Sequence, residues 1–481
     1  MNGKAQGISE DWLSLWIGLL LFVLSLAVLV DVDLLGWVVS TAVWGDLSKA
    51  LGTASKKYAG LGGVGALIAT YIALLVVMSA GASALKVNVP RFAAAFTAVF
   101  WIAYICWIIG SWANFAVNTP GGMKQFGITW SLRLTSEGGF IVALLAGLFV
   151  GNFLPGLAEW MREAVRPELY IKTAIVLLGG FLGVTAAEKL GLATSLMFLG
   201  LAAIIVAYLI FWSVVYYVAR VWFKFSREWA APLASGISVC GVSAAIATGA
   251  AIRARPVVPI MVSSLVVIFA VVELLVLPFV AQAALSHEPL VAGAWMALSV
   301  KTDGAAVASG AITEALILAN NAAEGVKYAP GWIIGTAATV KVFIDIFIGI
   351  WAFVLAYVWT TRIEQRDGDR ARLGEIWERF PKFVIGYVIT FVLILLIALA
   401  ASPATMGKVK AAMGEANTFR GIFFVLTFFT IGVMTNFRRL WEEGIGKLAA
   451  VYLLCLFGFI VWVGLIIAWL FYGGVKPPLA G

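Results

Sequence analysis

Apolar residues run along most of the chain in stretches of about 20, and short polar segments separate them. A helix needs about 20 mainly apolar residues to cross the hydrocarbon core of a bilayer. The pattern therefore predicts about thirteen membrane spans. They lie near residues 12–31, 60–79, 92–118, 139–153, 168–187, 193–220, 230–252, 257–284, 291–312, 333–360, 381–401, 419–437 and 446–473. The segment 34–50 is ambiguous: it lies along the membrane interface or forms a further crossing.

The last ten predicted spans divide into two groups of five, and the two groups begin on opposite sides of the membrane. Many secondary transporters are built from inverted repeats of this kind. We therefore predict an all-α polytopic membrane protein with a 5+5 inverted-repeat core and two broken helices that cross. Its expected parts are extra N-terminal helices (1–90), a linking helix with an extracytoplasmic loop (91–138), a first repeat (139–284) and a second repeat (285–481).

Composition agrees with the pattern. Hydrophobic residues make up 62% of the 481 residues and charged residues only 12%, whereas soluble domains carry roughly a quarter of their residues as charges. The net charge of +8 comes from basic residues in short loops, most of all 360–382, which the positive-inside rule places in the cytoplasm. This distribution argues against a nucleic-acid partner. It predicts a protein of the inner (plasma) membrane with a cytoplasmic N-terminus and an extracytoplasmic C-terminus.

Several kinds of catalytic and metal site are excluded by residue counts. His287 is the only histidine, and the three cysteines lie in apolar stretches without zinc-ligand spacing. This removes HExxH zinc sites and Ser-His dyads. The stretch "GLGGVG" at 60–65 matches G-x-G-x-x-G, but it follows no strand and opens an apolar span, so we interpret it as a packing face. We expect no metal, no cofactor and no enzymatic reaction.

One polar stretch interrupts the span 230–252. "ISVCGVSAAIATGAAIRARP", 237–256, places Ser238, Cys240, Gly241 and Ser243 within two turns. Irregular backbone at membrane depth is tolerated where it lines a watery cavity or is buried in protein. A broken helix there exposes amide N–H groups that carry about half a positive charge, which suits a small anion. The alternative is that small residues here permit close helix packing.

The corresponding span of the second group, 419–437, also contains polar residues: Thr427, Thr430, Gly432, Thr435 and Asn436. Interrupted spans at matching positions of two repeats indicate a binding site near the bilayer midplane. We therefore predict that this span is interrupted as well. Thr435 and Asn436 would then line the site together with the first stretch.

Ionisable residues inside spans are costly and usually functional. In "WMALSVKTDGAAVASG", 295–310, Lys301 and Asp303 are two residues apart and would not face each other on a continuous helix, so the helix is broken or each has its own partner. We expect Lys301, with Thr302, to attract the anion, although a structural ion pair is the alternative. Asp303 and Glu273 are the candidates for binding a coupling ion, either proton or sodium. For Glu273, a buried glutamic acid that is simply hydrogen-bonded is the alternative. Lys341 and Asp345, spaced i, i+4, are expected to form a mainly structural pair.

The motifs resemble those of a known family. "GISVCGVSAAIA", 236–247, closely resembles the signature Ser-Ile-Cys-Gly-Ala-Ser-Ala of the bacterial sulfate exporter family. Further segments follow in that family's order: "LLAGLFVGN" ending at 152, "IKTAIVLLGGFLG" at 171–183, "FPKFVIGYV" at 380–388 and "IGVMTNFRRL" at 431–440. The resemblance covers about 92–475. It implies an architecture similar to the bile-acid/sodium symporter-like superfamily, with a core domain that moves against a scaffold.

The chain departs from that family at one place. Where the family has His-Asp-Thr-Ser-Gln, this chain has Lys301, Thr302, Asp303, Gly304 and Ala305, which puts proton coupling at this position in doubt. We expect a secondary transporter of a small anion, a sulfur oxyanion or organosulfonate, that works by an elevator-like form of alternating access. A cation-coupled importer of an organic anion is the alternative, and a membrane sensor or enzyme is the weaker third. Whether the first ninety residues form a homodimer interface stays open.

Overall fold

The computed structural model describes residues 8–117, 120–132, 138–188, 190–255, 257–363, 377, 381–436 and 446–480. Within these residues, eleven helices are long and apolar enough to span a membrane, and two shorter apolar helices cover Gly138–Phe153 and Pro289–Ser299. Each predicted span contains one of these helices, so the chain is an all-α multi-pass membrane protein. The basic clusters expected in 360–382 and 436–447 lie mostly outside the described residues.

The chain forms two compact units, and each unit uses segments from both halves of the sequence. The first unit comprises 1–190, 318–327 and 382–435, and the second comprises 191–317, 328–381 and 436–481. The predicted repeats 139–284 and 285–481 are therefore each divided between the two units. Their inverted relationship stays a prediction.

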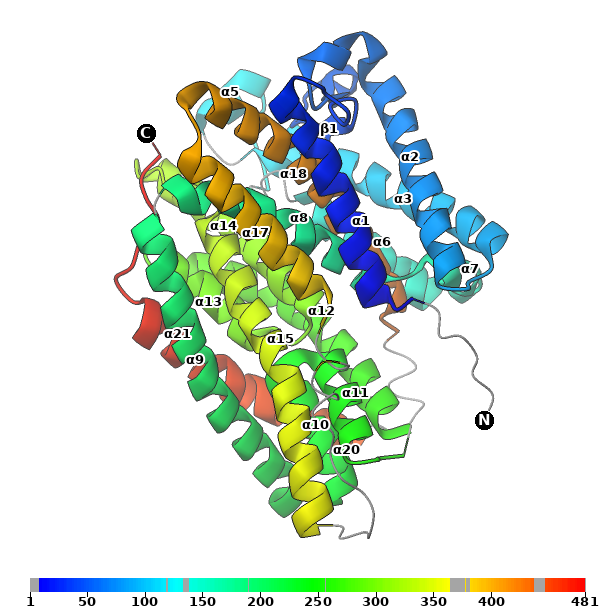
Figure 1. The fold of residues 1–481 in the computed structure, drawn as a ribbon, viewed down its shortest axis with the longest axis vertical. Helices are drawn as coiled ribbons and strands as arrows, with labels where there is room; N and C mark the ends of the chain where they lie inside the picture. The colour runs from blue at the N-terminus through cyan, green and yellow to red at the C-terminus, as the bar shows by residue number, and fades with distance from the viewer. Residues whose placement is uncertain are drawn as a thin grey trace. The chain divides into compact units, whose positions relative to one another are not determined.

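The first unit is a bundle around α8. Its elements are α1 (Glu10–Ser25), β1 (Val39–Thr41), β2 (Leu51–Thr53), α2 (Gly62–Ala84), α3 (Val89–Gly110), α4 (Ala113–Ala116), α5 (Pro120–Phe126), α6 (Gly138–Phe153), α7 (Pro155–Trp160), α8 (Pro167–Glu188), α17 (Phe383–Ala400) and α18 (Pro403–Met434) (Figure 1). The central helix α8 is buried along most of its length and packs against α1, α17 and α18. Lys172 of α8 also forms an ion pair with Asp11 of α1 at 2.7 Å.

Glycines allow α6 and α18 to pack closely. A side chain at Gly147 or Gly151 of α6 would overlap backbone carbonyls of α18, and one at Gly432 would overlap the carbonyl of Leu144. Small residues at such crossings let helix backbones approach each other in a membrane, where van der Waals packing drives helix association.

The ambiguous segment 34–50 is not a membrane span. It contains β1, which pairs with β2 as a short antiparallel ribbon with Val39 opposite Thr53. The amide of Val39 donates to Thr70 Oγ1 of α2 at 2.9 Å, which fixes the ribbon to the start of that helix. The first ninety residues therefore contribute two long helices, α1 and α2, and a small polar structure between them.

The second unit consists of helices, several of which are broken or bulged. Its α-helices are α9 (Leu190–Tyr217), α10 (Arg227–Ser235), α11 (Gly241–Ala251), α12 (Val257–Leu285), α13 (Pro289–Ser299), α14 (Asp303–Ala323), α15 (Trp332–Val358), α20 (Gly446–Cys455) and α21 (Val461–Tyr472). The last residues of α14, 318–323, belong to the first unit. Single π-helical turns cover Val218–Trp222, Gly236–Cys240, Trp359–Ile363 and Leu456–Ile460. Every residue of α13 is buried, and the helix packs between α15 and α21.

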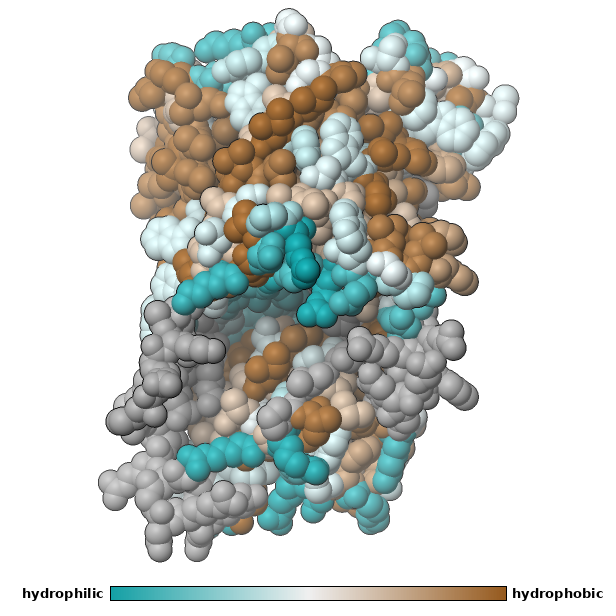
Figure 2. Space-filling model, turned by 90° about the vertical axis from the view of Figure 1, so that its right-hand side faces the viewer, coloured by the Kyte–Doolittle hydropathy of each residue, from teal (hydrophilic) through white to brown (hydrophobic). Residues whose placement is uncertain are grey.

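Large apolar side chains cover much of the surface. Phe153, Leu209 and Ile466 are each more than half exposed, as are many others of their kind. Figure 2 shows such side chains gathered in broad apolar patches with polar residues between them. Exposed apolar side chains gathered in this way fit a surface that faces lipid.

Candidate functional site

The first helix break lies between α10 and α11. The π-helical turn Gly236–Cys240 ends α10, and the backbone turns sharply at Gly241, which has φ 10° and ψ −97°. A side chain at Gly241 would overlap Val266 and approach the carbonyl oxygen of Lys301 to 2.8 Å. Only glycine therefore fits at this turn, and the break brings the backbone directly against a second helix.

The second break lies between α13 and α14. Helix α13 ends at Ser299, Val300 is extended with φ −76° and ψ 125°, and α14 begins at Asp303. Thr302 caps α14, because its Oγ1 accepts a hydrogen bond from the amide of Ala305 at 3.2 Å. The sequence left two readings of Lys301 and Asp303 open, and the break is confirmed. Each residue also has its own partner, because Lys301 donates to the carbonyl of Leu298 and Asp303 pairs with Lys341.

Gly241 packs against Lys301 and Thr302, so the two breaks cross each other. Each break leaves one helix end with unpaired carbonyls and another with unpaired amides. Carbonyl ends carry about half a negative charge and amide ends about half a positive charge. The crossing thus brings four partial charges together inside the second unit.

A lysine lies on the carbonyl end at each break. Lys341 Nζ of α15 donates to the carbonyl of Val239 at 3.4 Å, and Lys301 Nζ donates to the carbonyl of Leu298. Both side chains are 99% buried. Lys301 also lies over the ring of Phe211, 5.0 Å from its centroid. The two ammonium groups therefore compensate the negative ends of α13 and of the π-helical turn.

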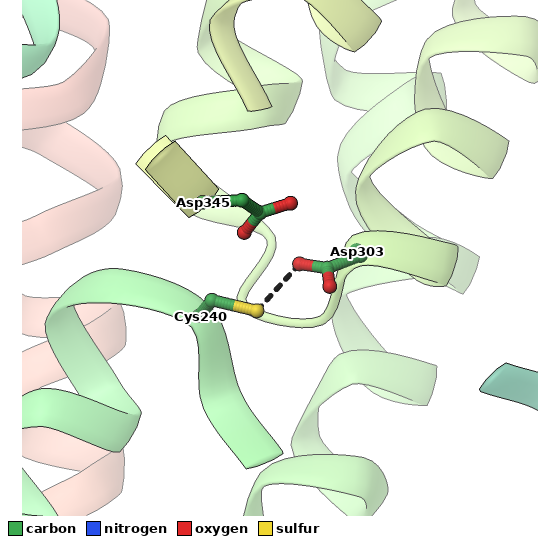
Figure 3. A group of neighbouring side chains, drawn as sticks. All are labelled: Cys240, Asp303 and Asp345. Atoms are coloured by element: carbon green, nitrogen blue, oxygen red, sulfur yellow. Dashed lines mark hydrogen bonds between the residues drawn. The ribbon is translucent and has the colours of Figure 1, made fainter. Parts of the chain in front are cut away.

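Three acidic or thiol side chains meet beside Lys341. The Cys240 thiol donates a hydrogen bond to Asp303 Oδ1, and the same oxygen pairs with Lys341 Nζ at 3.5 Å. The Asp345 carboxylate points toward the same point from α15, as Figure 3 shows. One ligand atom each of Cys240, Asp303 and Asp345 lies within 4.8 Å of the others.

This arrangement fits an internal ion pair better than a metal ion. A thiol and two carboxylates could coordinate a cation, but the Lys341 ammonium already supplies a positive charge to Asp303. A metal ion bound there would face that ammonium at close range. Lys341 and Asp345, interpreted from the sequence as mainly structural, thus belong to the site. Their depth within an apolar span was the signal that could have found them.

Glu273 of α12 reaches the second break from another side. Its Oε2 accepts the backbone amide of Lys301 at 3.4 Å, and its Oε1 has no hydrogen-bond partner among the described residues. The side chain is fully buried. The Glu273 carboxylate therefore accepts a hydrogen bond from one of the backbone amides at the helix break.

Most of the residues that the sequence selected come together here. Cys240, Gly241, Lys301, Thr302, Asp303 and Glu273 all surround the crossing. Ser238 lies in the π-helical turn, 5% exposed, and its Oγ has no hydrogen-bond partner in the described part of the chain. Ser243 lies in the first turn of α11 and is partly exposed.

The predicted interruption in 419–437 is wrong. Helix α18 runs unbroken from Pro403 to Met434. Thr435 follows it in the first unit, where its hydroxyl donates to the carbonyl of Ile431 and its own carbonyl accepts the Asn152 amide, both at 2.8 Å. Asn436 is the first residue of the C-terminal segment that belongs to the second unit. That Thr435 and Asn436 line the substrate site stays a prediction.

Comparison with known proteins gives a family but no activity. The family model described as "Conserved hypothetical protein 698" matches residues 130–451. A UPF0324 membrane protein of Nitrosomonas europaea is 41% identical over 99% of this chain and 98% of its own length. A UPF0324 membrane protein of Rhodopirellula baltica is 33% identical over 83% of this chain and 66% of its own length. No solved structure matches this chain.

Proposed function

The chain belongs to the UPF0324 membrane protein family, and we propose that it is a secondary transporter that moves a small anion by alternating access. The observation that carries the proposal is the pair of helix breaks that cross at Gly241 and Lys301. Discontinuous helices whose ends meet at membrane depth form the substrate sites of many secondary transporters. The division into two compact units supports an elevator-like movement of one unit against the other.

The positive groups at the crossing support an anionic substrate. Helices α11 and α14 both begin at the crossing, so their amide ends lie there. Lys301 and Lys341 are buried beside them. Ser238 offers a buried hydroxyl without a partner in the described chain. A sulfur oxyanion or an organosulfonate has several oxygens that could accept from such donors at once. This substrate class rests on the resemblance of 236–247 to the sulfate exporter family. The inner membrane and the cytoplasmic N-terminus belong to the same proposal.

Glu273 supplies a means of coupling in this proposal. Its carboxylate accepts the Lys301 amide, so it competes with a substrate anion for that donor. Protonation would remove the negative charge and release the amide, so that a proton and an anion would bind together. The site would act by binding alone, without an enzymatic reaction.

A cation-coupled importer of an organic anion is the second candidate. The close approach of Cys240, Asp303 and Asp345 favours it, because carboxylate oxygens are ligands for sodium. The ion pair between Lys341 and Asp303 weighs against it. In that candidate, binding of sodium would have to displace the lysine.

Flux measurements with the purified protein in liposomes test the proposal. We expect uptake of radiolabelled sulfate or an organosulfonate to fall at least about tenfold in Lys301→Met, because a charged donor is lost. Lys410→Met is the matched control, since Lys410 is exposed and pairs with Glu188. Glu273→Gln should retain flux but lose its dependence on a pH gradient. Unchanged flux in Lys301→Met would refute the anion site, and strict sodium dependence would favour the importer.

A further inference from the structure

The first unit contains a cavity of its own, which no residue of the helix breaks lines. A cavity of about 680 Å³ lies between the segment 28–57 and the first half of α18. Its charged lining includes Asp31, Asp33, Lys57, Lys408 and Glu415. We call this cavity the N-terminal pocket. A pocket of this volume is in the range that small organic ligands occupy.

The position of the pocket on α18 places it beyond the apolar part of the membrane. A helix of 32 residues is about 48 Å long, whereas the hydrocarbon core is about 30 Å thick. The charged residues Lys408, Lys410 and Glu415 all lie in the first half of α18, so this half projects from the bilayer. The pocket is therefore accessible to water-soluble ligands.

One end of the N-terminal pocket is positive. Lys408 Nζ pairs with Asp31 Oδ2 at 2.8 Å, and Lys57 Nζ donates to the backbone carbonyl of Asp31 at 3.4 Å. The hydrogen bond and charge of Lys408 lower the pKa of Asp31, so this carboxylate stays ionised at neutral pH. Lys408 pairs with the carboxylate of Asp31, Lys57 binds its backbone carbonyl, and Lys56 also lines the cavity, so positive charge is in excess at this end.

The other end is negative. Asp33 and Glu415 both line this cavity, and their carboxyl groups lie close enough to interact. Glu415 is only 5% exposed, and its Oε2 has no hydrogen-bond partner among the described residues. Asp33 is held in place because its Oδ1 accepts the amide of Gly36 at 2.7 Å. Two carboxyl groups in contact repel each other unless a proton or a cation lies between them, and a buried oxygen without a partner is costly.

We propose that the N-terminal pocket binds a small zwitterion, with its ammonium group at Asp33 and Glu415 and its anionic group at Lys57 and Lys408. An ammonium group has three donors and can satisfy the free Glu415 oxygen while it separates the two carboxyls. A divalent metal ion fits less well, because it needs six or more oxygen ligands at about 2.0–2.6 Å and three lysines line the same cavity. The proposal does not depend on the transport function.

Thermal unfolding of the full-length protein in detergent tests this inference. The probes are β-alanine and taurine, which carry both charges, and propylamine and propionate, which carry one each. We expect the zwitterions alone to raise Tm, in proportion to the logarithm of their concentration above Kd. Glu415→Gln and Lys408→Met should each abolish the shift. Lys410→Met should keep it, since Lys410 pairs with Glu188 and does not line the pocket.

Three results would overturn the inference. The first is the absence of any shift in the wild-type protein. The second is an equal shift in Glu415→Gln and in the wild type. The third is a rise of Tm with calcium chloride alone that Glu415→Gln removes, which would identify a metal site instead. Lys57→Gln provides an additional variant at an exposed side chain if Glu415→Gln does not fold.

Discussion

The segment 236–241 and the end of α18 contain similar small and polar residues, yet only the first one is broken. In α18, Thr427 Oγ1 donates to the carbonyl of Phe423 and Thr430 Oγ1 to that of Leu426, both at 2.7 Å. Each hydroxyl is satisfied by the preceding turn of its own helix, so the helix continues. In the other segment the Cys240 thiol donates to Asp303 on a different helix, and Gly241 packs against Lys301.

The difference teaches that polar residues alone do not break a membrane helix. A break needs partners on other helices that satisfy the freed backbone groups, because unpaired amides and carbonyls are costly in lipid. Lys341 supplies such a partner for the carbonyl of Val239. At the end of α18, Thr427 and Thr430 instead donate to carbonyls of their own helix.

The largest effect should come from removing the lysine that holds the first break. In Lys341→Met, Asp303 loses its buried partner, and we expect a loss of about 3–5 kcal/mol in the free energy of unfolding. The double variant Lys341→Met with Asp303→Asn should recover a large part of that loss. Chemical denaturation in detergent measures both. Equal stability of the single and double variants would contradict the pairing.

Filling the sharp turn should have the next largest effect. Gly241→Ala places a Cβ against Val266 and near the Lys301 carbonyl, and overpacking of this kind typically costs about 1–3 kcal/mol. Anion flux should fall as well, because in the proposed transport cycle the two helix breaks must move apart where they cross. Measurement of Tm and of flux on the same preparation checks the prediction. A variant with unchanged values of both would show that the close approach is not required.

Removing one hydroxyl from α18 and one from the first break sharpens the comparison. Thr430→Val removes a hydrogen bond within α18 and should cost about 1 kcal/mol in stability with little effect on flux. Ser238→Ala removes a hydroxyl without a partner in the described chain, so we expect stability within about 0.5 kcal/mol of the wild type and a reduced flux. The reverse outcome would remove Ser238 from the substrate site.

A small gain in stability is expected in the unbroken helix. A Cβ at Gly414 of α18 meets nothing within 4 Å. Gly414→Ala should therefore stabilise the protein by about 0.5–1 kcal/mol, since alanine loses less backbone entropy in a helix. A rise in Tm checks this expectation, and a fall would mean that this part of α18 must bend.

The sequence was sufficient to predict the spans, whereas the first break was one of two interpretations that it left open, the other being close helix packing. Apolar length fixed the helices, and Gly241 among small polar residues indicated the turn. The position of the second break was not decided, because Lys301 and Asp303 were compatible with a break or with separate partners. The threonines of 419–437 misled the prediction, since sequence shows which hydroxyls are present but not which carbonyls accept from them. The roles of Lys341 and the Glu273 carboxylate depend on contacts between distant helices.

The charges buried at the crossing also bear on the membrane potential. Lys301 and Lys341 are opposed by Asp303, Asp345 and Glu273, so these five side chains carry a formal charge of −1 when all of them are ionised. In the proposed cycle a proton neutralises Glu273 and a monovalent anion restores the same charge. A potential of 100 mV contributes about 2.3 kcal/mol for each elementary charge that crosses. The carrier would have the same charge with and without the proton and the monoanion, so the membrane potential would act equally on both forms. Transport of one proton together with one monoanion would therefore be electroneutral.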